Sequence, residues 1–262
     1  MQQVQQYYWV IIIAFSVGFL LKTRLNKQQQ LKSAPEYFRV PSYISLDTKE
    51  HGIFHTQKGL RDFRPSFLGK YSFGDSLVWT SNIDQEYEND YLYPHRDSVD
   101  LIPADGLQLI PRPDIQFPDP YAKKRDRKYF PVFIPNETRN TKLLFGKGFR
   151  VYAIMEAQDS SGNWRPIHYD SGDFCGMGKW ELRIHPKEYG VMLLPSYKGN
   201  YATELRIRMR NGENIIISKP FSGTISYKQF YLDKKSRTKE RASKNPTGFS
   251  FWQCFGSYPI EF

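Results

Sequence analysis

Cysteine is scarce in this chain of 262 residues, which contains only Cys175 and Cys254. Two cysteines are too few for a disulfide framework. One bridge between them would fit an oxidising compartment, but their spacing does not establish it. Cysteine usage therefore leaves the cellular compartment open.

Acidic residues are in deficit, since 27 Asp and Glu face 37 Lys and Arg and the formal net charge is +10. Such an excess favours attraction to nucleic acid, anionic lipid or an acidic partner. The cations lie in three separate runs, at residues 22–32, 123–128 and 234–244, rather than along one stripe. Runs of this kind are typical of solvated linkers.

The sequence contains no motif that is diagnostic of a particular enzymatic reaction. The chain has no G-x-S-x-G, no P-loop and no Cys-x-x-Cys pair. The stretch FGKGFRVYAIMEA resembles a kinase glycine-rich loop only faintly, because the third glycine is missing and Met155 stands where the lysine belongs. We therefore expect no catalytic residue, no cofactor and no small-molecule substrate, and we expect that the protein is not an enzyme. No recognised nucleic-acid-binding module is visible, so no nucleic-acid partner is expected.

Possible metal ligands and modification sites are isolated. His51 and His55 have helical i, i+4 spacing, but an intervening glycine disfavours a helix and no third ligand lies nearby. Residues 84–91 alternate acids as a calcium loop does, yet lack its central glycine and final glutamate. Three further side chains would have to converge from adjacent strands: His168, Cys175 and His185. The tripeptide NET at Asn136 matches an N-glycosylation acceptor, a pattern that often arises by chance. We expect no metal site.

One long hydrophobic run stands out, because residues 7–21 carry no formal charge. As a helix this run spans about 22 Å, and flanking residues extend it towards the ~30 Å of a bilayer core. A cleavable signal peptide would have a basic start and a small-residue cleavage site, and both are missing. The run predicts a retained transmembrane helix over residues 7–25, after a tail at 1–6. The residues expected to contact the lipid bilayer are Tyr7, Trp9, Ile12, Phe15, Leu20, Lys22 and Arg24.

The segment at residues 26–128 is rich in aromatic residues and proline. Prolines at 103, 111, 113, 118 and 120 exclude a helix there and favour extended chain. Because aromatic and aliphatic residues persist, we expect irregular, extended chain that lies against its own domain or a neighbour.

Short apolar runs bounded by turns fill residues 129–230 at hairpin spacing. In ATELRIRMR, arginines at 206, 208 and 210 alternate with apolar residues, which predicts a strand with one buried and one cationic face. The following RNGEN carries the Asn-Gly of a type I′ hairpin turn. These runs predict a mainly β fold, with an antiparallel β-sandwich over 129–230.

A basic linker and an aromatic tail occupy residues 231–262. So many aromatic side chains after a charged linker would be poorly tolerated in water. We expect the tail to fold back on the sandwich or to dock into a partner. The candidate docking residues are Phe249, Phe251, Trp252, Phe255 and Tyr258.

Several motifs between Phe130 and Phe230 suggest a family. These are the hairpin AIMEAQDSSGNWRPIHY, the following Cys-Gly, the turn PSYKG and the closing KQF. In these features the chain resembles a group of uncharacterised envelope proteins of Bacteroidota. The resemblance implies a β-sandwich and export, and it implies no catalytic residue.

Two features of the sequence make opposite predictions about the side of the membrane on which the domain lies. Cations follow the predicted helix at its C-terminal end, and by the positive-inside tendency they favour a cytoplasmic domain. The resemblance implies an extracytoplasmic, periplasmic domain, and large domains translocate with little regard to charge. We favour the periplasmic side.

The expected function is a non-catalytic, single-pass membrane subunit that scaffolds or stabilises a larger cell-envelope complex, whose other subunits are its partners. The alternative is a surface module that binds a glycan or another ligand through exposed aromatic residues such as Trp164 or Trp180.

Overall fold

The computed structural model describes residues 37–45, 65–79, 91–92, 102–118, 128–169 and 179–231. The predicted helix at 7–25, with its bilayer-contacting residues, and the aromatic tail beyond residue 231 lie outside these ranges. Within them, no helix is long and apolar enough to cross a membrane. The transmembrane helix therefore stays a prediction.

The described chain is mainly β, as the sequence predicts, and its one 3₁₀ helix, η2 (Tyr227–Phe230), follows the last strand. The strands in chain order are β1 (Tyr43–Ser45), β2 (Ser66–Ser72), β3 (Leu77–Trp79), β4 (Tyr91–Leu92), β5 (Ile110–Pro111), β6 (Phe117–Pro118), β7 (Lys128–Pro135), β8 (Lys142–Lys147), β9 (Arg150–Gln158), β10 (Trp164–Pro166), β11 (Lys179–Ile184), β12 (Glu188–Pro195), β13 (Tyr201–Asn211), β14 (Asn214–Ile217) and β15 (Phe221–Ile225).

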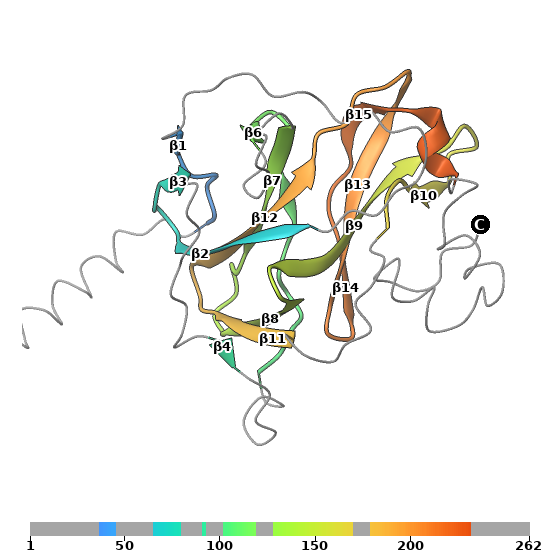
Figure 1. The fold of residues 1–262 in the computed structure, drawn as a ribbon. Helices are drawn as coiled ribbons and strands as arrows, with labels where there is room; N and C mark the ends of the chain where they lie inside the picture. Colours follow the sequence, from blue (N-terminus) through green and yellow to red (C-terminus); the bar gives the residue numbers. More distant parts are fainter. Residues whose placement is uncertain are drawn as a thin grey trace, which may run out of the picture.

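Nearly all of these strands join one curled antiparallel sheet, and only β1 and β3 form a separate parallel pair. The main order is β4-β11-β8-β9-β2-β12-β7-β5, and β13 lies beside β9 and carries β14 and β15 along its other side. The predicted sandwich of two separate sheets is thus corrected to one sheet that curls over its own inner face (Figure 1). The sheet is continuous because β9 belongs to both of its halves. Strand β9 pairs with β8 and β2 at its start and with β13 along residues 152–157.

Strand β2 comes from the segment predicted to be irregular, yet it lies inside the sheet between β12 and β9. Its pairing with β12 shifts register between Val191 and Met192, which leaves Leu68 as an extra residue beside Gly69. A bulge of this kind breaks the alternation by which strands are recognised in a sequence. The described parts of residues 26–128 therefore lie against their own domain.

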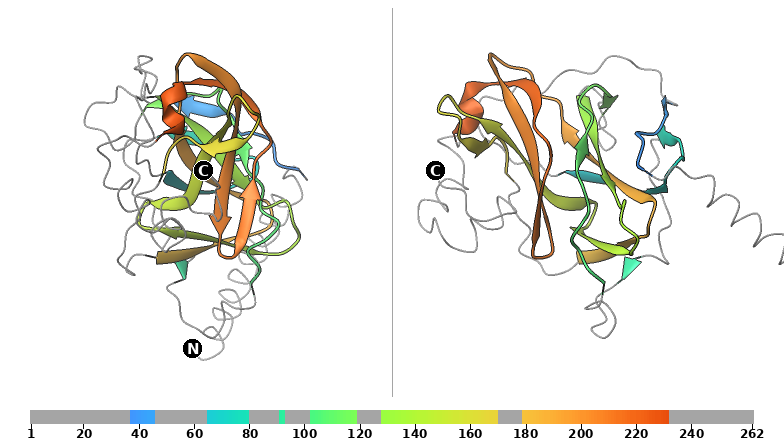
Figure 2. Two further views of the ribbon diagram at one scale, coloured as in Figure 1. Left: turned by 90° about the vertical axis from the view of Figure 1, so that its right-hand side faces the viewer. Right: turned by 180° about the vertical axis from the view of Figure 1, so that it is seen from behind.

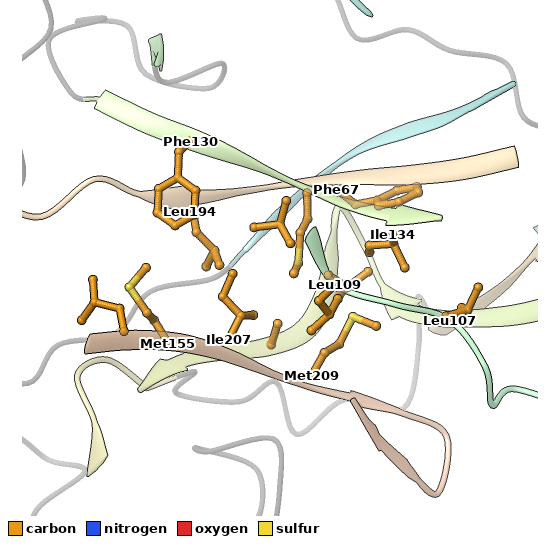
Figure 3. Close-up of a cluster of buried hydrophobic side chains, with 14 of the residues drawn as sticks. Phe67, Leu107, Leu109, Phe130, Ile134, Met155, Leu194, Ile207 and Met209 are labelled. Carbon is orange, nitrogen blue, oxygen red and sulfur yellow. The ribbon is translucent and has the colours of Figure 1, made fainter. Parts of the chain in front are cut away.

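The inner face of the curl encloses the larger hydrophobic core. Met155 of β9 and Ile207 and Met209 of β13 face Phe130 and Ile134 of β7 across it (Figure 3). Leu107 and Leu109, from the loop before β5, fill the space between these two walls (Figure 3). Burial of these side chains is the main stabilising contribution to the fold.

A second core covers the opposite face of β2, β7 and β12. Phe133, Tyr189 and Val191 point to this face and are buried with side chains from residues 38–117, which precede β7. Those covering residues are Phe38, Val40, Phe73, Leu77, Ile115 and Phe117. Both faces of these strands are therefore buried, which explains why β7 and β12 read as continuous apolar runs rather than as alternating ones.

The curl is held by Asn211, which lies at the end of β13 and is fully buried. Its side-chain amide accepts a hydrogen bond from the Phe145 amide (2.8 Å) and donates to the carbonyl oxygens of Leu143 and Ala104 (2.7 Å each). Leu143 and Phe145 belong to β8 just where β9 turns away from it. The amide group of Asn211 thus replaces the missing peptide partner and ties the β13–β14 hairpin to β8.

The hairpin turn after β13 differs from the predicted one. The two loop residues are Gly212 and Glu213, because Asn211 still pairs with Asn214. Gly212 has a φ of 62°, whereas the φ of Glu213 is not positive. Glycine with positive φ only at the first loop position is the pattern of a type II′ turn, so the type I′ prediction was wrong.

Gly146 gives a first testable prediction. It pairs directly with Trp180 across β8 and β11, and a Cβ atom at this position would lie 2.0 Å from the indole ring. We expect Gly146→Ala to lower the free energy of unfolding by about 1–3 kcal/mol, because the indole must leave its packed position. Urea denaturation measures this effect. The matched control is Gly190→Ala in β12, another strand glycine without positive φ, where the added Cβ atom would lie 3.1 Å from the Phe67 ring. An equal or smaller effect at Gly146 would show that the indole moves aside without cost.

Candidate interaction surface

The predicted two-faced strand is confirmed in β13. Leu205, Ile207 and Met209 are buried, whereas the alternating arginines are only half-buried on the opposite side. We call this opposite side of β9, β10, β13 and β14 the outer face. Its main side chains are Glu156, Trp164, Arg206, Arg208, Arg210, Ile215 and Ile217.

Glu156 lies beneath two of the arginines and changes the charge of the outer face. It pairs with Arg206 across β9 and β13, and its side chain is only 2 % exposed. The Arg206 Nε donates to its Oε2 (2.6 Å), and the Arg208 Nη1 lies 3.5 Å from its Oε1. The predicted cationic face is therefore partly neutralised from within. The sequence contained an indication of this carboxylate. Because side chains alternate along β9, Glu156 points to the other face of the sheet from the apolar Met155.

Arg206 also covers Trp164. The guanidinium carbon lies 4.3 Å from the centre of the indole ring, as in a cation–π contact. The second tryptophan considered for ligand binding is in the core: Trp180 is 8 % exposed, packs against Phe67 and donates its Nε1–H to the Gly148 carbonyl (2.6 Å). Trp180 is thus not available on the surface.

Arg210 is held at the hairpin end of the outer face. Its Nε donates to the Gly212 carbonyl (2.8 Å), and its Nη2 lies 3.5 Å from a Glu213 carboxylate oxygen. Burial lowers the pKa of Arg210, but a guanidinium stays protonated in proteins. The end of the hairpin therefore keeps a fixed positive charge.

The apolar part of the outer face is on β14. Ile215 and Ile217 are 40 % and 47 % exposed and stand beside Arg210 and Arg208 on β13. Figure 2 shows from two sides that β14 runs along β13 as one hairpin. Within the described chain β14 pairs with β13 alone, so its other side is an edge of the sheet.

The two described histidines that were considered as metal ligands have hydrogen-bond partners within the fold. The imidazole of the buried His168 accepts from the Met155 amide through Nε2 (3.1 Å), so the neutral ring carries its proton on Nδ1, 3.2 Å from the Tyr197 hydroxyl. The His185 Nδ1 lies 3.0 Å from the Thr141 hydroxyl. Among the described residues no three His, Cys, Asp or Glu side chains are grouped as a metal site requires. Cys175, His51 and His55 lie outside those residues.

Asn136 is fully buried at the end of β7. Its Nδ2 donates to the carbonyl oxygens of Asn140 and Ile184 (2.8 Å each), and its Oδ1 accepts from the Thr138 amide and hydroxyl. Every polar atom of the side chain is therefore used inside the fold. A glycan on Asn136 is incompatible with this structure.

The predicted docking residues of the tail, Phe249, Phe251, Trp252, Phe255 and Tyr258, lie outside the described residues, as do the predicted bilayer contacts. The sequence did not predict the outer face as one surface, because its side chains come from strands that are about 50 residues apart in the sequence. No protein-family model, curated protein or solved structure matches the chain.

Proposed function

We propose that the protein is a non-catalytic subunit of a cell-envelope complex, held in the membrane by a single helix at residues 7–25. The observation that best supports an assembly role is the way the sheet binds extended chain. One face of β2, β7 and β12 is covered by extended N-terminal segments, which insert aromatic side chains and add backbone pairs. A sheet of this kind is suited to hold extended arms of other subunits.

Phe38 shows how such a segment is held. Its ring centre lies 5.3 Å from that of Phe73, 5.5 Å from that of Phe133 and 5.1 Å from that of Tyr189. Its backbone amide donates to the Glu137 carboxylate (2.9 Å), although the two residues are 99 positions apart. One aromatic side chain in a ring-lined site plus one charge-assisted hydrogen bond can fix an otherwise irregular chain.

The outer face offers a second surface with similar chemistry. It combines half-buried arginines with exposed isoleucines, so that charged and apolar groups are available side by side. Glu156 and His168, whose residue types are common in active sites, make hydrogen bonds within the fold instead. These features support binding of protein segments.

We propose a periplasmic location for the domain, which rests on the resemblance to exported envelope proteins. A reporter that is active only in the periplasm, fused after Phe262, should be active. An inactive fusion together with an active cytoplasmic reporter at the same position would place the domain in the cytoplasm.

Truncation of the aromatic tail tests the assembly role. The full-length protein, purified from native membranes in mild detergent, should migrate with partners well above its own mass. A chain that ends at Lys244 keeps the whole described sheet, so we expect the same thermal transition but loss of the partners. A lower transition temperature would show that the tail folds back on its own sheet. A monodisperse monomer for the full-length chain would contradict the proposal.

The alternative, a glycan- or ligand-binding module, has less support. Trp180 is in the core and Arg206 covers Trp164, so neither ring is open for stacking on a sugar. Binding of the full-length protein on a glycan array, and its loss in Trp164→Ala, would favour this alternative.

A further inference from the structure

The open edge of β14 presents both backbone and side-chain groups for a further contact. Ser218 donates its amide to the Ile207 carbonyl (2.9 Å), so its backbone faces β13. Because backbone direction alternates along a strand, the N–H and C=O groups of Ile215 and Ile217 point away from β13. Both side chains are exposed on the outer face. Within the described chain these backbone groups meet no other strand.

An exposed apolar edge strand is a template for another strand, and soluble proteins usually protect such edges with charge or proline. Here Ser218 follows β14, and Lys219 and Pro220 come next; Pro220 has no N–H to donate, so any added pairing ends before it. Residues 214–217 remain open. The edge is short and bounded, which favours one defined partner over unlimited addition.

We propose that β14 pairs with β14 of a second copy of this chain, antiparallel and about a twofold axis that passes at Ile216. In this register Ile215 of each copy stands opposite Ile217 of the other. The outward N–H and C=O groups of both residues are then used in hydrogen bonds between the copies. The proposal goes beyond the assembly role, since it concerns a contact between identical chains.

Charge complementarity selects this register. A twofold axis at Ile216 places Glu213 of one copy opposite Lys219 of the other, and it does so twice. Both residues are exposed, and the Glu213 side chain is 94 % exposed. An axis at Ile215 would place Glu213 opposite Ile217, and an axis at Ile217 would place Lys219 opposite Ile215. Glu213 and Lys219 flank β14 on its two sides, so both opposite-charge pairs would stand at the ends of the added ladder, where their attraction favours the axis at Ile216.

The side-chain rows of the outer face also continue across this axis. Each row would run from Arg210 through Ile215 to Ile217 and Arg208 of the other copy. Two isoleucines then meet at the centre, and the arginine stems cover them from both sides. A self-complementary patch of this kind is what a twofold interface requires.

Charge reversal tests the register. The full-length protein in detergent micelles is examined by light scattering over a range of concentrations, and we expect a reversible dimer. Glu213→Lys and Lys219→Glu should each raise the dissociation constant about tenfold or more, because each places two like-charged pairs in the interface. An equimolar mixture of the two variants should recover the dimer, since each charge then meets its opposite. The matched control is Lys228→Glu, the same charge change on η2, which should leave the dimer unchanged.

A second variant tests the backbone contact. Ile217→Pro removes an N–H that points away from β13, so the hairpin keeps its own hydrogen bonds and only the contact between copies is lost. We expect a folded monomer, checked by circular dichroism. A wild-type chain that stays monomeric at all concentrations, a dimer that survives in each single variant, or a mixture that fails to associate would each overturn the proposal. None of these outcomes affects whether truncation of the aromatic tail releases other partners. The dimer and the assembly role can therefore be refuted independently.

Discussion

Replacing Glu156 with alanine is expected to lower the free energy of unfolding by about 3 kcal/mol. The carboxylate is buried and holds two arginines on β13, with the Arg206 Nε at 2.6 Å. Removing one partner from a buried ion pair costs about 3–5 kcal/mol, because the remaining charge has lost its compensation. We take the lower end because the Arg206 and Arg208 side chains keep 19 % and 17 % exposure and can reach water.

Two further variants separate charge from packing at this position. Glu156→Gln keeps the shape and one hydrogen-bond acceptor, so it should cost less than Glu156→Ala. Glu204→Ala removes a carboxylate from the same sheet, where it accepts from the Ser222 hydroxyl (2.6 Å) in an exposed setting, and should cost less than about 1 kcal/mol. Urea denaturation provides all three values. Equal effects at residues 156 and 204 would show that burial of the ion pair contributes nothing.

Replacing Asn211 with alanine is expected to cost about 2–4 kcal/mol. The substitution removes three hydrogen bonds and leaves the Phe145 amide and the Leu143 and Ala104 carbonyl oxygens without their partner. Buried groups that lose a partner cost about 1–3 kcal/mol each, and partial relaxation reduces the sum. Asn211→Asp keeps the acceptor for Phe145 but loses both donors, so it should also be strongly destabilising.

Asn214 provides the control for this prediction, because it is the cross-strand neighbour of Asn211 in the same hairpin. Its side chain makes one long contact, 3.5 Å to the Asn211 carbonyl. Asn214→Ala should therefore change the free energy of unfolding by less than about 0.5 kcal/mol. Hydrogen exchange gives an independent test, since the Phe145 amide should exchange faster in Asn211→Ala. Unchanged protection of that amide would contradict the role of Asn211.

Local patterns were sufficient to predict the β-rich region and the two faces of β13, because side-chain alternation is a property of consecutive residues. The path of the sheet was not predictable in this way. The single curled sheet depends on β9 leaving β8, and on Asn211 filling the vacated position 66 residues from Phe145. The bulge in β2 hid a central strand, and the pairing of Trp180 with Gly146 hid a core residue among apparent surface aromatics.

The outer face illustrates the same limit. Arg206 and its neighbours were recognisable from the sequence, but their partner Glu156 lies 50 residues earlier. A single sequence contains no record of which strands become neighbours, so the neutralising charge was not assigned. The predicted membrane helix and aromatic tail are different, because they rest on composition alone and lie outside the described residues.

The central position of β2 has a consequence for the order of events during synthesis. This strand leaves the ribosome early, but its neighbour β12 follows only after roughly 120 further residues. At ~5–20 residues per second, about 6–25 s pass before β2 can pair with β12. Pairings of such long sequence separation also form slowly in a complete chain. Until then, Phe67 and Leu68 stay uncovered, so the nascent chain has a period in which a chaperone can determine whether it folds or aggregates.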